Sequence, residues 1–250
     1  MKKLFITLTI ITSSIFTACS DNSDTENVSK LTTYPIITLA GADPALVRVG
    51  TAYTDPGAVG TVGGTPVPLT TRFVGRYRKN VSTTLDTNVS DVYNLEYTAT
   101  NSDGFKRTAK RQVIVARTGD LVNSIEGLYT STVARNGITP SPAYINIKYI
   151  LIWKNANGDY EVSDAFGGWY LFGRAIADSE TPGGTIRAVN IPANSFTFPG
   201  NPLTNRYFGG TANITGLTVN PVTKTLVLTC SWVSGTSNFN FQSTLTQVPL

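Results

Sequence analysis

Beyond its N-terminal segment, the chain has no stretch in which apolar residues recur with the 3.6-residue period of an amphipathic helix. Its 22 glycines and 13 prolines interrupt it at short intervals, and Val, Ile, Thr, Tyr and Phe dominate the segments between them. Segments of this length and composition favour β-strands, and Gly and Pro are typical of the turns that join strands. The sequence therefore predicts an all-β protein.

The first part of the chain is expected to form an immunoglobulin-like β-sandwich over residues 34–117. Its clearest strand covers residues 93–99, where Tyr93, Leu95, Tyr97 and Ala99 alternate with polar residues and should face inward. Turn chemistry follows in the NSDG run at 101–104 and occurs earlier in Asp55-Pro56-Gly57. About seven short strands in this length fit an Ig-like sandwich.

The second part, residues 118–250, is expected to form an antiparallel meander that curls into a sandwich or a partly closed barrel. Asn157-Gly158 is the strongest hairpin signal in the chain. In the segment 144–154, the odd-numbered residues from Ile145 to Trp153 should share one face. The expected strands are 127–134, 144–154, 160–163, 169–175, 185–191, 195–198, 211–219, 223–233 and 239–247. We expect each of the two domains to fold with its own core.

The N-terminal segment has the layout of a bacterial lipoprotein signal. Lys2 and Lys3 precede a short apolar run at 4–15, and Phe16-Thr17-Ala18-Cys19 forms the cleavage box. The run is too short to span a bilayer, so residues 1–18 are predicted to be a removed signal peptide. Residues 19–33 would be a lipidated Cys19 followed by a flexible acidic tether. The alternative is an ordinary secretory signal with a chance cysteine.

Charge and composition exclude some functions. Removal of Lys2 and Lys3 leaves a nearly balanced charge, so we expect no nucleic-acid partner. Basic residues gather at 72–79 and 106–111, and we expect them to form solvated strand faces, with an anion-binding patch as the alternative. Cys230 should lie in the core beside Leu226, Leu228 and Trp232.

The residues needed for catalysis or metal binding are scarce. The chain has no histidine, and lipidation of Cys19 would leave one cysteine, so no disulfide or cysteine metal site is expected. The tightest carboxylate group is Asp159, Glu161 and Asp164, and a glycosidase could use such a pair. Asp159 and Asp164 lie by turn ends, however, where acidic residues are ordinary surface residues. We therefore expect neither an enzyme nor a cofactor. Asp55 and Asp103 lie in turns, where calcium ligation is the less favoured alternative.

An aromatic cluster among glycines gives the candidate ligand site. All three tryptophans lie after residue 118. We expect Trp169, Tyr170 and Phe172 to include a solvent-facing ring in a shallow groove, with Arg174 and Asp164 at its edge. The glycines at 167, 168 and 173 would let a ligand approach the backbone. The alternative is that these rings simply fill the core.

Residues 34–117 resemble the Ig-like repeat family of bacterial surface proteins. The likeness lies in PIITL at 35–39, VRVGTAYTDPGA at 47–58 and YTATNSDG at 97–104. Members of that family generally act as spacers or adhesive modules, so the resemblance implies a stalk.

The C-terminal part resembles the second domain of Bacteroidetes surface lipoproteins of unknown function, through DYEVSDAFGGWY at 159–170, Gly173-Arg174 and NPVTKTL at 220–226. Such proteins are associated with Sus-type nutrient importers. The resemblance implies a lipid-anchored protein of the outer membrane, exposed on the cell surface, that binds a polysaccharide or oligopeptide nutrient beside importer components. The alternative is a structural docking or adhesion subunit that binds only protein partners.

Overall fold

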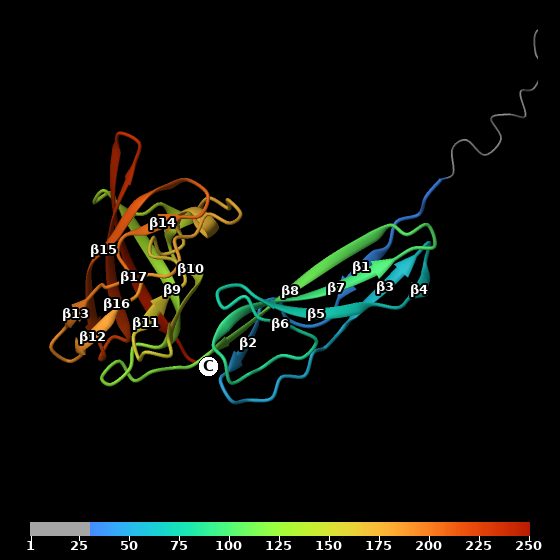
Figure 1. Cartoon of the computed structure of the whole chain (residues 1–250), viewed down its shortest axis with the longest axis horizontal. Coiled ribbons are helices and arrows are strands. Elements are labelled where there is room, and N and C mark those ends of the chain that lie inside the picture. The colour runs from blue at the N-terminus through green and yellow to red at the C-terminus, as the bar shows by residue number, and fades with distance from the viewer. Residues whose placement is uncertain (1–30) are drawn as a thin grey trace, which may run out of the picture.

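The computed structural model describes residues 31–250 and consists of two β domains (Figure 1). An Ig-like domain contains β1 to β8, and a C-terminal domain contains β9 to β17. The all-β prediction is confirmed, since the helical elements are short turns. The predicted signal peptide and Cys19 lie outside the described residues, as does most of the predicted tether.

Two sheets form the Ig-like domain, in the orders β1-β3-β4 and β2-β8-β7-β5-β6. Strand β2 runs parallel to β8, and the other pairs are antiparallel. The inward face predicted for 93–99 is confirmed, because Tyr93, Leu95, Tyr97 and Ala99 are buried. The strands are β1 (Ile36–Leu39), β2 (Ala45–Arg48), β3 (Ala58–Val62), β4 (Thr65–Val67), β5 (Thr70–Gly75), β6 (Val81–Ser82), β7 (Asp91–Thr100) and β8 (Lys106–Ala116).

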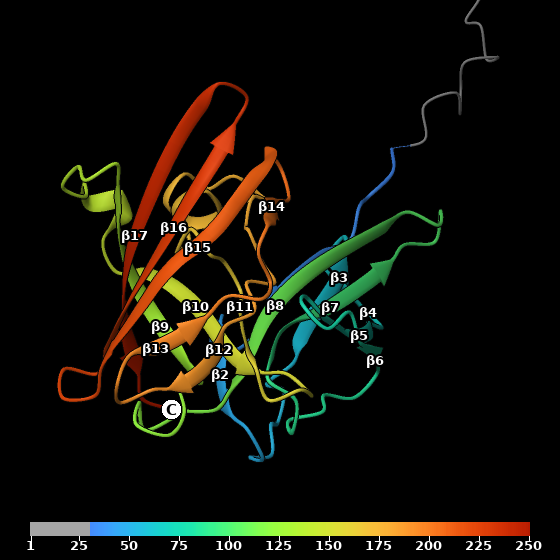
Figure 2. The same cartoon turned by 60° about the vertical axis from the view of Figure 1, so that its left-hand side comes forward.

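The C-terminal domain is a curled antiparallel sheet in the order β11-β10-β9-β17-β16-β15-β14, with a small β12-β13 ribbon beside it (Figure 2). Its hairpins are sequential on each side, but the first strand, β9, pairs with the last strand, β17. The elements are β9 (Gly127–Arg135), η2 (Pro142–Tyr144), β10 (Ile147–Lys154), β11 (Tyr160–Val162), η3 (Trp169–Gly173), β12 (Arg187–Asn190), β13 (Ser195–Thr197), β14 (Leu203–Asn205), β15 (Gly209–Asn220), β16 (Thr225–Ser234) and β17 (Ser237–Val248).

Most of the strands predicted for this domain form close to the expected residues, and Cys230 lies in the core with Leu226, Leu228 and Trp232 as predicted. Burial raises the pKa of the Cys230 thiol to about 12, which keeps it protonated at neutral pH. The predicted strand at 169–175 is wrong, since this segment contains the π-helix η3. No helix among residues 31–250 has the length and apolar character needed to cross a membrane.

Strand β10 is buried on both faces. The register against β9 shifts between Lys148 and Ile150, so the simple alternation predicted for 145–153 does not hold. Ile147, Ile150 and Ile152 pack into the core of the C-terminal domain. The opposite face, with Leu151 and Trp153, packs against the Ig-like domain.

That outer face of β10 builds an apolar cluster between the domains. Val92 of β7 and Ile114 and Ala116 of β8 join it from the Ig-like side. Tyr77 stacks on Trp153 with ring centroids 5.3 Å apart. Strands β7 and β8 therefore bury apolar residues on both faces, because their alternate residues fill the Ig-like core. The two domain cores are thus joined by a third cluster that the sequence did not predict.

The Ig-like core is organised around a buried arginine, although Arg111 was expected on a solvated strand face. Its side chain is fully buried and forms an ion pair with Asp55. It also donates to the carbonyls of Ala40 and Gly57, and Tyr97 Oη donates to Asp55 at 2.6 Å. The YTDPGA run thus supplies the carboxylate that neutralises this arginine.

Candidate functional site

The segment predicted to form the ligand site is a tightly wound loop. The Asp164 carboxylate accepts backbone N–H groups of Phe166, Gly168 and Thr181 at 2.9–3.1 Å. Gly167 and Gly168 have φ values of +63° and +86°, which L side chains rarely adopt. A Cβ atom on Gly167 would lie 2.2 Å from Ser243 Oγ. These two glycines therefore serve the fold of the loop, where we expected them to let a ligand approach.

The structure places three of the five predicted site residues inside the domain. Trp169 and Tyr170 are only 7% and 6% exposed, and Asp164 is 1% exposed. Burial raises the pKa of Asp164 to about 6, while its three backbone donors oppose that rise. Tyr170 lies among aromatic rings of the core, including Phe166 and Trp232. Phe172, in contrast, is 38% exposed, and Arg174 is exposed.

Trp169 and Arg174 line the same hollow on the surface of the C-terminal domain. We call it the arginine hollow; its walls are Arg135, Tyr144, Trp169, Arg174 and the loop 138–141, and its volume is about 230 Å³. Tyr144 and Trp169 stack with their centroids 3.5 Å apart and their planes 3° apart. The hollow thus combines aromatic and aliphatic walls with two cationic side chains, the usual composition of a small-ligand site.

The guanidinium group of Arg135 packs on aromatic rings. Its carbon Cζ lies 4.9 Å from the ring centroid of Trp169 and 5.2 Å from that of Phe239. Arg174 donates from Nε to Tyr144 Oη at 3.3 Å. Within residues 31–250, no carboxylate oxygen lies within 4.0 Å of either guanidinium group. The positive charge of the hollow is therefore not neutralised by ion pairs of the described chain.

Phe172 faces a different space. It lines a narrow cleft between the two domains together with Leu171, Tyr77, Tyr149 and Arg76, with a volume of about 60 Å³. The π-helix therefore divides the predicted site residues, with Trp169 and Arg174 on one side and Phe172 on the other. Since the cleft lies directly over the interdomain cluster, its walls are held by the contact between the domains.

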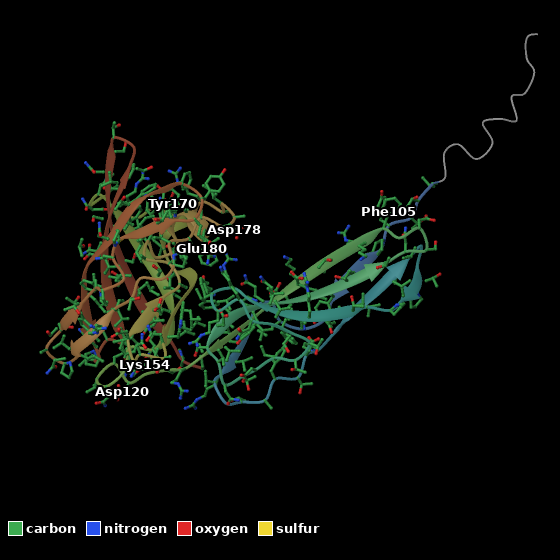
Figure 3. All side chains as sticks on the ribbon, in the orientation of Figure 1. Phe105, Asp120, Lys154, Tyr170, Asp178 and Glu180 are labelled. Atoms are coloured by element: carbon green, nitrogen blue, oxygen red, sulfur yellow. The ribbon has the colours of Figure 1, made fainter. Side chains whose placement is uncertain are left out.

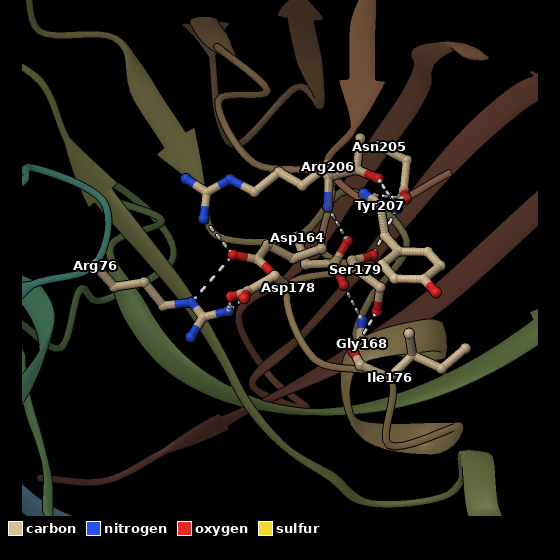
Figure 4. Close-up of polar contacts among 11 residues, drawn as sticks. Arg76, Asp164, Gly168, Ile176, Asp178, Ser179, Asn205, Arg206 and Tyr207 are labelled. Carbon is tan, nitrogen blue, oxygen red and sulfur yellow. Dashed lines mark hydrogen bonds and ion pairs between the residues drawn. The ribbon is translucent and has the colours of Figure 1, made fainter. Parts of the chain in front are cut away.

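An ionic network closes this contact between the domains (Figure 4). Arg76, which follows β5, donates from Nε and Nη2 to Glu180 at 3.1 and 2.9 Å. Arg206 donates to the same carboxylate, and Asp178 accepts from Arg76 Nη2 at 3.3 Å. Figure 3 shows Glu180 and Asp178 on the side of the C-terminal domain that faces the Ig-like domain. The Glu180 side chain is fully buried, so its charge depends on these two arginines.

The acidic residues weighed for catalysis have structural partners. Asp159 receives a two-pronged contact from Arg187, with distances of 2.9 and 2.8 Å. Glu161 accepts from Asn155 and Thr185. Asp55, weighed for calcium, is engaged by Arg111 and Tyr97. In the part of the chain that the structure describes, no group of three or more His, Cys, Asp or Glu side chains could hold a metal ion.

Sequence reasoning missed Arg135, Tyr144, Arg76 and Glu180. Arg135 and Tyr144 reach the hollow only because the chain between β9 and β10 folds back as a loop with the turn η2, and no sequence signal specifies that path. Arg76 and Glu180 are about 100 residues apart in the chain. The apolar run at 113–116 did carry a signal for the contact between the domains, because a strand with no polar face is expected to be buried on both sides.

The different burial of the rings predicts a contrast between two substitutions. Trp169→Ala should lower the free energy of unfolding by about 3–5 kcal/mol, because it removes a buried ring and leaves a cavity. Phe172→Ala should cost about 1 kcal/mol or less, because that ring is already partly in water. Urea unfolding followed by tryptophan and tyrosine fluorescence measures both; equal losses would contradict the described burial.

Comparison with known proteins finds a separate family match for each of the two domains. The family model described as a bacterial surface protein Ig-like domain matches residues 37–115, and a C-terminal domain family model matches residues 118–247. The crystal structure of the lipoprotein BT2262 from Bacteroides thetaiotaomicron has a similar fold, with a TM-score of 0.60 and 22% sequence identity. The match covers 86% of this chain and 100% of that one. No curated protein matches the chain.

Proposed function

The chain belongs to the family defined by that C-terminal domain, and on this basis we propose that it is a lipid-anchored protein of the outer-membrane surface that holds glycan or peptide nutrient for a Sus-type importer. Its Ig-like domain would be a spacer, as the matched description of a bacterial surface protein domain suggests. The lipoprotein signal read from residues 1–19 and the fold shared with a Bacteroides lipoprotein support the anchor.

The observation that carries this proposal is the position of the chain's N-terminal side. The first described residues enter the Ig-like domain at the end remote from the C-terminal domain (Figure 1). The interdomain cluster and the Arg76–Glu180 contact hold the two domains together as one elongated body. A lipid anchor at Cys19 would therefore leave the C-terminal domain, with its arginine hollow, as the part farthest from the membrane.

The anchor gives the first test. Cys19→Ala should remove the lipid and shift the protein from the membrane to the soluble fraction, because two or three acyl chains supply about 0.8 kcal/mol per buried methylene. Membrane fractionation with immunoblotting measures the shift. A Ser20→Ala variant is the control and should remain in the membrane. Retention of the Cys19 variant after a salt wash would contradict the anchor.

Nutrient binding is tested with the full chain in detergent. Affinity electrophoresis through gels containing single polysaccharides, and calorimetry with oligopeptides, should find at least one retained class. Binding of protein partners alone, with no retained polysaccharide or peptide, would favour a docking or adhesion subunit.

A further inference from the structure

We infer that the arginine hollow binds a carboxylate-bearing sugar, so that the ligand class of this protein is an acidic, uronate-containing glycan. This inference rests on the proposed function, because it names the nutrient that the C-terminal domain would hold. It starts from the two guanidinium groups of Arg135 and Arg174, which line the hollow without a carboxylate partner among the described residues.

Arg135 is preorganised for an anion. Its planar group lies over the rings of Trp169 and Phe239, so packing limits the side-chain freedom that binding would otherwise cost. A guanidinium group packed on rings keeps its N–H groups at the edge, where they can donate to both oxygens of one carboxylate. Arg135 also closes β9 and pairs with Phe241 of β17, so the sheet fixes its backbone.

Arg174 and Tyr144 supply the opposite wall. Apart from the contact of Arg174 Nε with Tyr144 Oη, the guanidinium N–H groups of Arg174 make no hydrogen bond within residues 31–250. Tyr144 is half-buried against Trp169 and offers a ring surface beside the loop 138–141. Charge, donors and a flat apolar surface therefore meet in one hollow.

A sugar suits these walls better than a peptide does. Extended peptides are commonly held by adding a strand to a free sheet edge. The only strand residue of the hollow is Arg135, which pairs with Phe241 of β17 on one side and forms a β-bridge with Ile138 of its own loop on the other, so it offers no free edge to a peptide strand. A uronate ring, in contrast, presents an apolar C–H face to an aromatic wall and its carboxylate to the arginines. In Figure 2, η2 lies on the side of the C-terminal domain away from the Ig-like domain, which leaves room for a long polysaccharide.

The test compares charged and neutral forms of one polymer. Affinity electrophoresis and calorimetry would be run on the full chain in detergent with polygalacturonate, alginate and hyaluronate, and with fully methyl-esterified polygalacturonate, which keeps the backbone without its charge. Polyglutamate provides an acidic peptide. The variants are Arg135→Gln and Arg174→Gln, and the control is Arg107→Gln, which removes the same charge from an exposed position on β8. Unfolding curves verify that each variant is folded.

We expect at least one polyuronate to bind, its esterified or neutral form to bind less tightly, and each hollow variant to weaken binding about 10- to 100-fold. Arg135→Lys should recover only part of this loss, and Arg107→Gln should bind as the wild type does. Equal binding of charged and esterified polymer, preference for polyglutamate, or binding unaffected by both hollow variants would overturn the inference. So would failure of every polyuronate to bind. If a neutral glycan or a peptide is retained instead, the proposed nutrient function still stands and only the uronate inference fails. The nutrient function itself fails only if no ligand of the whole panel binds.

Discussion

Arg111→Met is expected to lower the free energy of unfolding of the Ig-like domain by about 3–5 kcal/mol, the cost of breaking a buried ion pair from one side. Methionine fills part of the space but cannot pair with Asp55. The carbonyls of Ala40 and Gly57 would also lose a donor. Chemical denaturation followed by circular dichroism measures the loss.

The matched control is the neighbouring residue on the same strand. Lys110 is exposed and pairs with Glu96 at 3.0 Å, so Lys110→Met should cost about 1 kcal/mol or less. A double-mutant cycle with Asp55→Asn should give a large coupling to Arg111, because both residues belong to one buried network. Similar losses for Lys110→Met and Arg111→Met would show that the buried network does not hold the domain.

Glu180→Ala is expected to destabilise the contact between the domains by about 3–5 kcal/mol, because it leaves Arg76 partly buried without its main partner. Arg206 would lose the same partner. We expect the interdomain cluster to couple the unfolding of the two domains in the wild type, so that calorimetry shows one thermal transition, and we expect this transition to separate into two in Glu180→Ala. Asp178→Ala is the control; the Asp178 side chain is 80% exposed and should contribute little.

Lowering the pH should reproduce part of the destabilisation expected for Glu180→Ala. Burial alone would raise the pKa of Glu180, but its hydrogen bond with Arg76 and the charges of Arg76 and Arg206 outweigh burial and hold that pKa below its ordinary value of 4.5. A carboxylate with a depressed pKa stabilises the folded state above its unfolded pKa and loses this contribution as the pH falls through the folded pKa. The wild type should therefore lose more stability than Glu180→Ala on acidification below pH 4.5. Parallel pH profiles of the two proteins would contradict this assignment.

The fold was largely predictable because its main signal is local. Alternation along 93–99 and 226–232 depends only on neighbouring residues, and both segments are strands with the expected inward faces. The pairing of β9 with β17 was not predictable in the same way, since it joins segments more than 100 residues apart. Arg111 was misplaced because a charged residue in a strand is normally exposed, and its partners lie more than 50 residues earlier.

The candidate site was predictable only in part. The aromatic segment at 169–172 was correctly singled out as unusual, but its alternation was taken for a strand, although Gly167-Gly168 and the buried Asp164 carboxylate wind it into a loop and a π-helix. The winding buries Trp169 and Tyr170 and separates Phe172 from Arg174. Arg135 and Tyr144 are brought to the same hollow by a loop whose course no short-range pattern specifies.

The parallel pair β2–β8 has a mechanical consequence for a protein tethered through Cys19. In sequence, β2 follows the N-terminal segment and β1, whereas β8 leads directly into the C-terminal domain. If the C-terminal domain of the anchored chain is pulled away from the anchor, as the proposed function implies, the two strands are pulled toward opposite ends of the pair. Parallel pairing spaces its hydrogen bonds evenly along the strands, and the register joins four residue pairs from Ala45–Val113 to Arg48–Ala116. These bonds would then be loaded in shear and would have to yield together, so the Ig-like domain would resist tension between an N-terminal anchor and the C-terminal domain.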